Sequence, residues 1–326
     1  MPWSMALILT AALSVVTQAT QTIEVHKNFC ELDRKSECQK GQCLRYDPKK
    51  FPNSRSIVTF FPGGRLGNKI SAYLNLLWVH LDHDQDVYFE KESHEVLDRY
   101  FQNINFPTLE DGLCDWRTFP FEKYESNIED LGAPEWKKGK AIEIFVNKKN
   151  FMRHEVKGGR KYYRQYREES LHALKFRPQF QNHAENTLRK VAKKADVKGE
   201  ITFVGVHNRR TDYLEFRKKR LGLDNLYEDY FQDAMEYLKE EYDNPVFIYV
   251  SDDMKWGQKN LKEEKDIFFV GCGDPDDVDC IGKDFAVLSN CNHTITTHGT
   301  FGHWAAFLAG GEIYTEYGAI VPDAYN

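Results

Sequence analysis

The sequence predicts an α/β protein built from parallel sheets covered by helices, and three observations support this. The chain has 326 residues, of which 41% are hydrophobic, enough for two domains with apolar cores. Its C-terminal half alternates short apolar runs with amphipathic segments, as repeated β-α-β units do. Its N-terminal half holds an apolar run that leads through a glycine-rich turn into another amphipathic segment.

The alternation in the C-terminal half defines the order of the elements. Apolar, β-branched and aromatic residues predict strands at 201–207, 246–251, 267–270, 293–297 and 312–316. Helical spacing of apolar residues predicts helices between them, at 227–241, 254–264, 283–290 and 301–308. Right-handed crossovers join such strands into a doubly wound parallel sheet.

The N-terminal half is less regular. Residues 57–61 (IVTFF) predict a strand, and a helix follows with apolar residues at Ile70, Tyr73, Leu74, Leu77, Trp78 and Leu81. The turn between them contains Gly64, Arg65, Gly67 and Asn68, and such glycines let backbone N–H groups face an anion. Neither the P-loop pattern nor the nucleophile-elbow pattern of hydrolases occurs. Residues 141–146 predict a further strand, and 147–198 is charged and helical.

We expect four parts along the chain. Residues 1–20 are a signal peptide or short signal anchor, and 21–56 a lumenal stem. Residues 57–198 form an N-terminal domain and 199–326 a C-terminal domain. The leader is uncharged over residues 1–23 with an apolar run at 5–16, shorter than the about 20 residues that a transmembrane helix usually needs. The net charge of −6 gives no reason to expect nucleic acid as a partner.

Seven cysteines agree with a secretory compartment. Cys272 and Cys280 flank an acidic loop and form a candidate disulfide, which leaves Cys291 free in an apparent strand. The remaining four can form two bridges whose pairing is open: Cys30, Cys38, Cys43 and Cys114. Zinc binding by Cys272, Cys280, Cys291 and His293 is the rival interpretation, but close C-x-x-C pairs are missing.

The segment 204–213 (VGVHNRRTDY) carries the main candidate site. A predicted strand delivers Arg209 and Arg210 to its carboxyl end, where open α/β sheets bind ligands. Paired guanidinium groups suit a phosphate, and Asp212 is near enough in sequence to hold one of them. A surface ion pair at a strand end is the alternative interpretation of this motif alone.

A second motif lies at 291–308, where a strand runs into Gly299-Thr300-Phe301-Gly302 and opens a helix. Thr300 is placed where an N-cap is expected, and its hydroxyl can cap the helix or bind a phosphate oxygen. Pairs of aspartates at 82–86 and at 274–276 offer D-x-D patterns for a metal, but each is better explained as a solvated loop.

Together these segments resemble the α-1,2-fucosyltransferases, glycosyltransferase family 11. The matching blocks are Gly64-Arg65-Leu66-Gly67-Asn68, His207-x-Arg209-Arg210-x-Asp212-Tyr213, Ser251-Asp252-Asp253, Lys283-Asp284-Phe285 and Cys291-x-His293-x-Ile295 through Gly299-Thr300-Phe301-Gly302-x-Trp304-Ala305-Ala306. They occur in the order of the family over residues 57–318. The arginine motif is shared with other fucosyltransferases, whereas the Thr-Phe-Gly-x-Trp-Ala-Ala block is more specific to the α-1,2 group.

The resemblance implies a GT-B-like fold, with two Rossmann-like doubly wound domains facing each other across a cleft. It implies inverting transfer of L-fucose from GDP-β-L-fucose to the 2-hydroxyl of a terminal β-galactoside. The C-terminal domain would bind the donor and the N-terminal domain the acceptor. The family needs no metal or other cofactor. Its animal members are typically type II membrane proteins of the Golgi, so membrane anchoring or secretion after cleavage is expected here.

The residue pattern assigns roles consistent with this. Arg210 would stabilise the departing β-phosphate, with Arg209 assisting, Asp212 orienting an arginine and His207 orienting an arginine or touching the donor. The donor-binding candidates are Ser251, Asp252, Asp284, Thr300, Phe301 and Gly302, and the turn Gly64, Arg65, Gly67 and Asn68 borders the cleft. The general base stays open among Asp212, Asp253, His207 and other carboxylates.

Some residues depart from the family pattern, and two alternative functions remain. Thr211 stands where glycine is usual, which raises the question of a positive φ after Arg210. His298 and His303 replace residues that are often apolar. The alternatives are a different GDP-fucose enzyme, of α-1,6 or protein O-linked type, and a catalytically silent glycan-binding relative.

Overall fold

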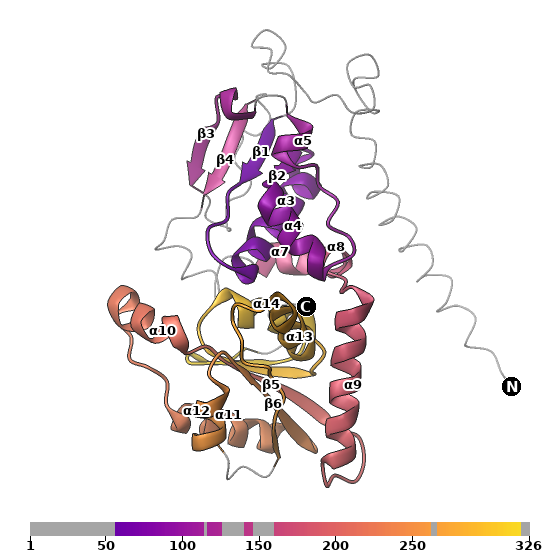
Figure 1. The fold of residues 1–326 in the computed structure, drawn as a ribbon, viewed down its shortest axis with the longest axis vertical. Coiled ribbons are helices and arrows are strands. Elements are labelled where there is room, and N and C mark those ends of the chain that lie inside the picture. Colours follow the sequence, from indigo (N-terminus) through magenta and orange to yellow (C-terminus); the bar gives the residue numbers. More distant parts are fainter. Residues whose placement is uncertain (1–55, 114–115, 126–139, 146–159, 262–265, 321–326) are drawn as a thin grey trace, which may run out of the picture. The chain divides into compact units, whose positions relative to one another are not determined.

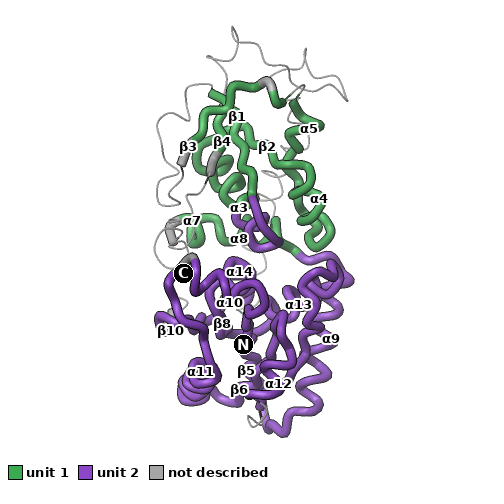
Figure 2. The backbone as a smooth tube through the Cα atoms, turned by 60° about the vertical axis from the view of Figure 1, so that its left-hand side comes forward, with its two compact units in different colours: residues 1–62, 72–175 green, residues 63–71, 176–326 purple. Residues whose placement is uncertain are grey.

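The computed structural model describes residues 56–113, 116–125, 140–145, 160–261 and 266–320. It divides into two compact units (Figure 2): unit 1 comprises Met1–Pro62 and Ala72–Lys175, and unit 2 comprises Gly63–Ser71 and Phe176–Asn326. The predicted leader, almost all of the predicted stem and four of the cysteines lie outside the described residues.

Unit 1 contains a four-stranded sheet in the order β2-β1-β4-β3, in which all neighbouring strands are parallel (Figure 1). Its strands are β1 (Ile57–Phe60), β2 (Asp86–Phe89), β3 (Glu122–Glu125) and β4 (Ala141–Phe145). Its helical elements are α3 (Leu66–His83), α4 (Lys91–Tyr100), α5 (Leu109–Gly112), η3 (Trp116–Thr118), α7 (Arg160–Gln165) and α8 (Arg167–Ala173).

The core of unit 1 forms from the apolar positions that the sequence marks. Of the predicted stripe of α3, Tyr73, Leu74, Leu77 and Trp78 are buried in unit 1, whereas Leu81 is half-buried. Trp78 donates its indole N–H to Ser170 Oγ at 3.1 Å. A second apolar cluster packs around the sheet and consists of Ile57, Tyr88, Leu109, Leu113, Phe119 and Ala141. The first residues of α3 belong to unit 2, so the glycine-rich turn is grouped with the second sheet.

Unit 2 contains a six-stranded sheet in the order β10-β9-β8-β5-β6-β7. The strands are β5 (Thr202–Asn208), β6 (Pro245–Ser251), β7 (Ile267–Phe269), β8 (His293–Thr296), β9 (Ile313–Thr315) and β10 (Gly318–Ile320). Only the β9–β10 pair is antiparallel. The helical elements are α9 (Pro178–Lys194), α10 (Thr211–Phe216), the π-helix η6 (Arg217–Leu221), α11 (Glu228–Glu241), α12 (Met254–Asn260), α13 (Val278–Ser289) and α14 (Thr300–Ala309).

Helices cover both faces of this sheet. Alternate residues of β5 point to opposite faces, so they pack against different helices. Val204 and Val206 pack with the apolar stripe of α11, which includes Phe231 and Leu238. On the other face Gly205 leaves room for α13, since a Cβ there would lie 3.0 Å from Leu288. The predicted α/β class with parallel sheets is confirmed in each unit.

The strand order reverses beside β5. The chain runs from β5 to β6 and β7 in one direction, then returns to β8 and β9 on the other side. In doubly wound sheets such a reversal opens a crevice at the carboxyl ends of the strands. The crevice therefore lies between the ends of β5 and β8, where both sequence motifs emerge.

Two boundaries differ from the sequence prediction. Helix α13 begins at Val278 rather than at residue 283, because Asp277 caps it by accepting from the N–H groups of Asp279 and Cys280. Helix α9 belongs to unit 2, where Gln181 donates to Asn290 Oδ1 at 2.8 Å. The expected limit at residue 198 places α9 in the other domain, because charge alone does not say which sheet a helix covers.

Within the described ranges, no helix combines the length and the apolar character needed to cross a bilayer.

Candidate functional site

A cavity of about 290 Å³ lies in unit 2 at the carboxyl ends of β5 and β6 and at the start of α14, which follows β8. Segments far apart in the sequence supply its walls. The lining residues are Gly64, Arg65, Leu66, Gly67, Asn68, His207, Arg209, Asp212, Val250, Ser251, Asp252, Gly273, Asp274, Pro275, Ile281, Asp284, Thr300 and Phe301. This is the reversal point that the topology marks.

Most sequence-predicted site residues meet in this cavity. The exceptions are Arg210 and Gly302, which do not line it. Gly302 lies behind the wall, where a Cβ would come within 2.0 Å of Thr296 and 2.5 Å of His207. The lining also includes Gly273, Asp274 and Pro275, which belong to the acidic loop that the sequence analysis did not assign to the site.

The glycine-rich turn packs directly on the start of α14. Thr300 Oγ1 donates to Asn68 Oδ1 at 2.8 Å, and Asn68 Nδ2 donates to the carbonyl of Gly63 at 2.8 Å. Gly64 has a φ of 87°, which favours glycine. The expectation that Thr300 caps α14 is wrong: Gly299, with a φ of 140°, occupies the N-cap and Thr300 is the first helical residue. The Thr300 hydroxyl does not cap the helix and instead links the start of α14 to the glycine-rich turn.

Arg209 presents its guanidinium to the cavity. Its Nη2 lies 3.2 Å from both carboxylate oxygens of Asp212, and its guanidinium lies 4.7 Å from the ring centre of Tyr213. Its backbone N–H donates to Thr297 Oγ1 at 3.1 Å. Arg65 Nη2 lies 3.9 Å from Asp212, so two guanidinium groups gather around one carboxylate at the cavity wall.

Arg210 points to a different environment. Its guanidinium lies over the ring of Trp256, 4.1 Å from the ring centre, and its Nε lies 3.6 Å from Asp253. Its side chain is only 12% exposed. Asp253 in turn caps α12 by accepting from the N–H of Trp256 at 3.1 Å. Adjacent residues at a strand end point to opposite sides, so only one arginine of the pair faces the cavity.

Asp252 braces the turn that carries both arginines. Its Oδ1 accepts from the backbone N–H of Arg210 at 2.7 Å, and its Oδ2 accepts from the hydroxyl of Thr211 at 2.6 Å. Thr211 is the first residue of α10 and is not among the residues with positive φ. The concern that a residue other than glycine strains this turn is therefore wrong, because the threonine adds a hydrogen bond instead.

We expect Thr211→Val to lower the free energy of unfolding by about 1 kcal/mol, because it keeps the β-branched shape and removes the hydrogen bond to Asp252. Urea denaturation of both proteins measures this. Thr211→Ser, which keeps the hydroxyl, is the matched control. Equal stability of the valine variant and the wild type would contradict a bracing role for this bond.

His207 is buried, and desolvation lowers the pKa of its imidazole to about 3, with the charge of Arg209 adding to the effect. It is therefore neutral at working pH. Its ring packs 5.1 Å from the ring centre of Phe301. Of the three named candidates for a general base, Asp253 is engaged with Arg210 and α12, whereas Asp212 lines the cavity and is half-exposed.

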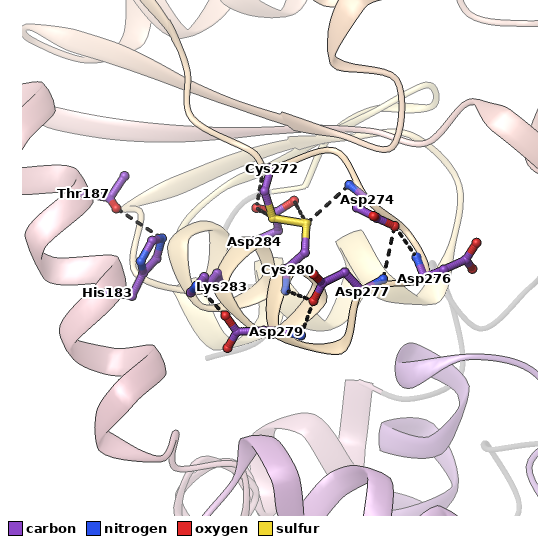
Figure 3. Close-up of a disulfide and its surroundings, with 10 residues drawn as sticks. All are labelled: His183, Thr187, Cys272, Asp274, Asp276, Asp277, Asp279, Cys280, Lys283 and Asp284. Atoms are coloured by element: carbon purple, nitrogen blue, oxygen red, sulfur yellow. Dashed lines mark hydrogen bonds and ion pairs between the residues drawn. A yellow bond between two sulfur atoms is a disulfide. The ribbon is translucent and has the colours of Figure 1, made fainter.

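The acidic loop is closed by a disulfide between Cys272 and Cys280 (Figure 3). Asp284 lies beside it and accepts from the backbone N–H of Cys272 at 3.0 Å. Burial raises the pKa of the Asp284 carboxyl to about 6, against the lowering by this hydrogen bond and one from the N–H of Gly273. Asp284 thus adds a carboxyl group to the cavity lining, from a segment distant in sequence from the arginine turn.

The zinc interpretation of the cysteines is wrong. Cys272 and Cys280 are oxidised, so their sulfurs are not available as thiolate ligands, although Asp284 lies near both. Cys291 is buried and free, and burial raises the pKa of its thiol. In the described part of the chain neither D-x-D pattern belongs to a cluster with ligand geometry. Asp82 accepts from Tyr166 at 2.9 Å, and Asp274 from the backbone N–H of Asp276 at 3.0 Å.

Comparison with known proteins places these features in context. Residues 136–319 match the family described as Glycosyl transferase family 11. Galactoside alpha-(1,2)-fucosyltransferase 1 of Leontopithecus chrysomelas is 31% identical over 271 residues, which are 82% of this chain and 69% of the relative. The mouse (Mus musculus) protein of the same name is 31% identical over 292 residues, covering 85% and 70%.

Solved structures share the fold at low identity. A variant of FUT1 of Arabidopsis thaliana in complex with GDP has a TM-score of 0.52 and 12% identity, covering 91% of this chain and 74% of that one. The fucosyltransferase NodZ from Bradyrhizobium has a TM-score of 0.50 and 12% identity, covering 82% and 99%. The predicted GT-B-like fold class is confirmed.

Proposed function

Because the chain belongs to glycosyltransferase family 11, and is thus a glycosyltransferase, we propose that it transfers L-fucose from GDP-β-L-fucose to the 2-hydroxyl of a terminal β-galactoside. The observation that carries the proposal is the cavity of unit 2, where Arg209 and Arg65 gather at the reversal point of a doubly wound sheet. The names of the relatives supply the galactoside and the linkage.

We assign the pyrophosphate of the donor to the arginine side of this cavity. When the bond between fucose C1 and the phosphate oxygen breaks, negative charge develops on the β-phosphate. Arg209 and Arg65 supply fixed positive charge there, so we propose a reaction that needs no divalent cation. Asp212 holds Arg209 in place, and Arg210 anchors the turn through Trp256 and Asp253.

We assign the nucleoside end of the donor to the side of Asp284. A carboxylate repels a phosphate but accepts hydrogen bonds, and guanine presents N–H donors along one edge. The hydrogen bonds from the N–H groups of Cys272 and Gly273 fix the carboxyl in place. The disulfide of the acidic loop holds one of these donors, Cys272, beside the carboxyl. This placement differs from the sequence-based expectation that Asp284 borders the phosphate and fucose.

The transfer itself follows from this placement. The acceptor 2-hydroxyl attacks fucose C1 from the face opposite to GDP, which inverts the β linkage to α. Asp212, which lines the cavity near Arg209, is our candidate for the base that takes the hydroxyl proton. GDP leaves with the electron pair of the broken bond. We further propose that the enzyme works in the Golgi lumen, anchored or released by its N-terminal segment, where the disulfide is stable.

The donor preference tests the proposal. Saturation binding to the purified protein is measured with GDP-fucose, GDP-mannose and UDP-galactose. We expect GDP-fucose to bind most tightly and to release GDP only when a β-galactoside is present. Equal binding of UDP-galactose would contradict the role of Asp284, and absence of GDP-fucose binding would contradict the proposed function.

Donor binding is also expected to depend on pH. Asp284 loses its proton as the pH rises through about 6, and only the carboxylate accepts hydrogen bonds with both oxygens. GDP-fucose affinity should therefore fall about tenfold for each pH unit below 6 and stay level above 7. Asp284→Asn should bind weakly at all of these pH values and lose the slope. A slope that persists in Asp284→Asn would assign the titration to another group.

A further inference from the structure

A buried arginine joins three surface segments of unit 2 near the end of α10. Arg217 is 3% exposed, and its guanidinium donates to Glu316 at 2.7 and 2.9 Å and to the carbonyl of Asp224 at 2.8 and 3.0 Å. Glu316 follows β9, and Asp224 follows η6. The three segments are therefore held in one fixed arrangement.

Three exposed aromatic residues are close in sequence to Arg217 or to its two partners. Phe216 is its neighbour in sequence, Tyr317 follows its partner Glu316, and Tyr227 stands three residues beyond Asp224. They are 40%, 62% and 62% exposed, and the described residues contain one other large apolar side chain with such exposure, Val278. Exposed apolar side chains on segments that are held together in this way make a candidate binding surface.

Ring contacts connect this surface to the cavity. Phe216 stacks on Tyr213 with ring centres 5.2 Å apart, and the guanidinium of Arg209 lies 4.7 Å from the centre of the Tyr213 ring. Arg209 lines the cavity, so two successive contacts lead from the proposed reaction centre to Phe216. Figure 1 shows α10, which carries these rings, projecting from the sheet of unit 2.

We propose that Phe216, Tyr317 and Tyr227, named here the aromatic platform, bind the acceptor oligosaccharide beyond the galactose that receives fucose. This rests on the proposed function, because it concerns the second substrate of that reaction. The C–H groups on one face of a galactose or glucosamine ring form an apolar patch, which packs on a flat aromatic ring. Tyrosine adds a hydroxyl that bonds to sugar hydroxyls.

The rigidity of the platform favours this occupant. Covering one face of a neutral sugar gains little binding free energy. A surface that had to become ordered first would therefore bind it weakly. The Arg217–Glu316 pair and the stack on Tyr213 hold the backbone beside Phe216 and Tyr317 before any ligand arrives. Aromatic side chains also have few rotatable bonds to immobilise.

Steady-state kinetics of Phe216→Ala and Tyr317→Ala, with lactose and GDP-fucose as substrates, tests the platform. We expect the KM for lactose to rise about tenfold in each variant, as for truncation of a buried aromatic contact. The KM for GDP-fucose should stay unchanged, because Phe216 and Tyr317 do not line the cavity. Phe216→Tyr, which keeps the ring, should retain the wild-type KM for lactose.

Val278→Ala is the matched control, since Val278 has the same 40% exposure as Phe216 and lies at the start of α13. An unchanged KM for lactose in both alanine variants would overturn the platform. A rise in the KM for GDP-fucose as well would also overturn it, because the rings would then only support the fold. If the wild type transfers no fucose, the proposed function fails, and lactose binding by ligand-observed NMR to wild type and Phe216→Ala decides the platform alone.

Discussion

Replacing Arg209 by alanine is expected to lower kcat for fucose transfer by about 100- to 1,000-fold, the usual cost of removing one donor that stabilises developing charge. The side chain lines the cavity and is aligned by Asp212 and by the ring of Tyr213. The KM for GDP-fucose should change less, because the charge on the β-phosphate grows as the bond breaks. Rapid-quench or coupled GDP-release assays with purified protein measure both constants.

Arg210→Ala is the informative comparison. Arg210 packs on Trp256 and lies next to Asp253, outside the cavity lining, so its loss should lower the melting temperature while folded enzyme keeps much of its kcat. Arg209→Lys retains the charge without the planar fork and should recover part of the lost rate. A larger loss of kcat in Arg210→Ala than in Arg209→Ala, with intact folding, would reverse the two roles.

Gly67→Ala is expected to weaken GDP-fucose binding by more than tenfold. A Cβ at this position would lie 2.5 Å from Thr300 Oγ1 and 2.6 Å and 2.7 Å from backbone atoms of Thr300 and Phe301. Backbone cannot yield as a flexible side chain can, so the turn and the start of α14 must separate. That separation breaks the hydrogen bond between Thr300 and Asn68 and moves two segments of the cavity wall apart.

Gly63→Ala is the matched control for this substitution. Gly63 belongs to the same turn, has no positive φ, and a Cβ there would meet nothing within 4 Å. Its donor affinity and kcat should equal those of the wild type within about twofold. Fluorescence titration with GDP-fucose measures both variants, and wild-type affinity in Gly67→Ala would contradict the close packing of the turn on α14.

The sequence predicts much of unit 2 because two local signals agree there. Apolar runs such as 246–251 and amphipathic runs such as 227–241 alternate, and each strand end carries a polar motif. Carboxyl ends of parallel strands share one edge, so residues as distant as Arg209 and Thr300 were expected to meet. The strand β2 and the helix α4 of unit 1 were not predicted. β2 has four residues and follows α3 after a short turn, too little sequence to show a period of its own.

The sequence does not show that Arg209 lines the cavity whereas Arg210 packs outside its lining. Which arginine faces the cavity depends on the partners that the other finds, and Trp256 and Asp253 come from the next β-α connection. The contribution of Gly273 and Pro275 to the cavity was missed for a similar reason. Their only local signal was the spacing of Cys272 and Cys280, which marks a closed loop without saying where it lies.

The linkage of the product decides whether the protein is an α-1,2-fucosyltransferase. The protein is incubated with GDP-fucose and lactose in EDTA, and the trisaccharide is isolated and analysed by NMR. We predict α-linked fucose on the 2-hydroxyl of galactose, formed without added metal and at a rate at least about 100-fold lower in Arg209→Ala, which is the cost of one charge-stabilising donor. Fucose on another hydroxyl, or transfer that stops in EDTA and resumes with a divalent cation, would contradict it.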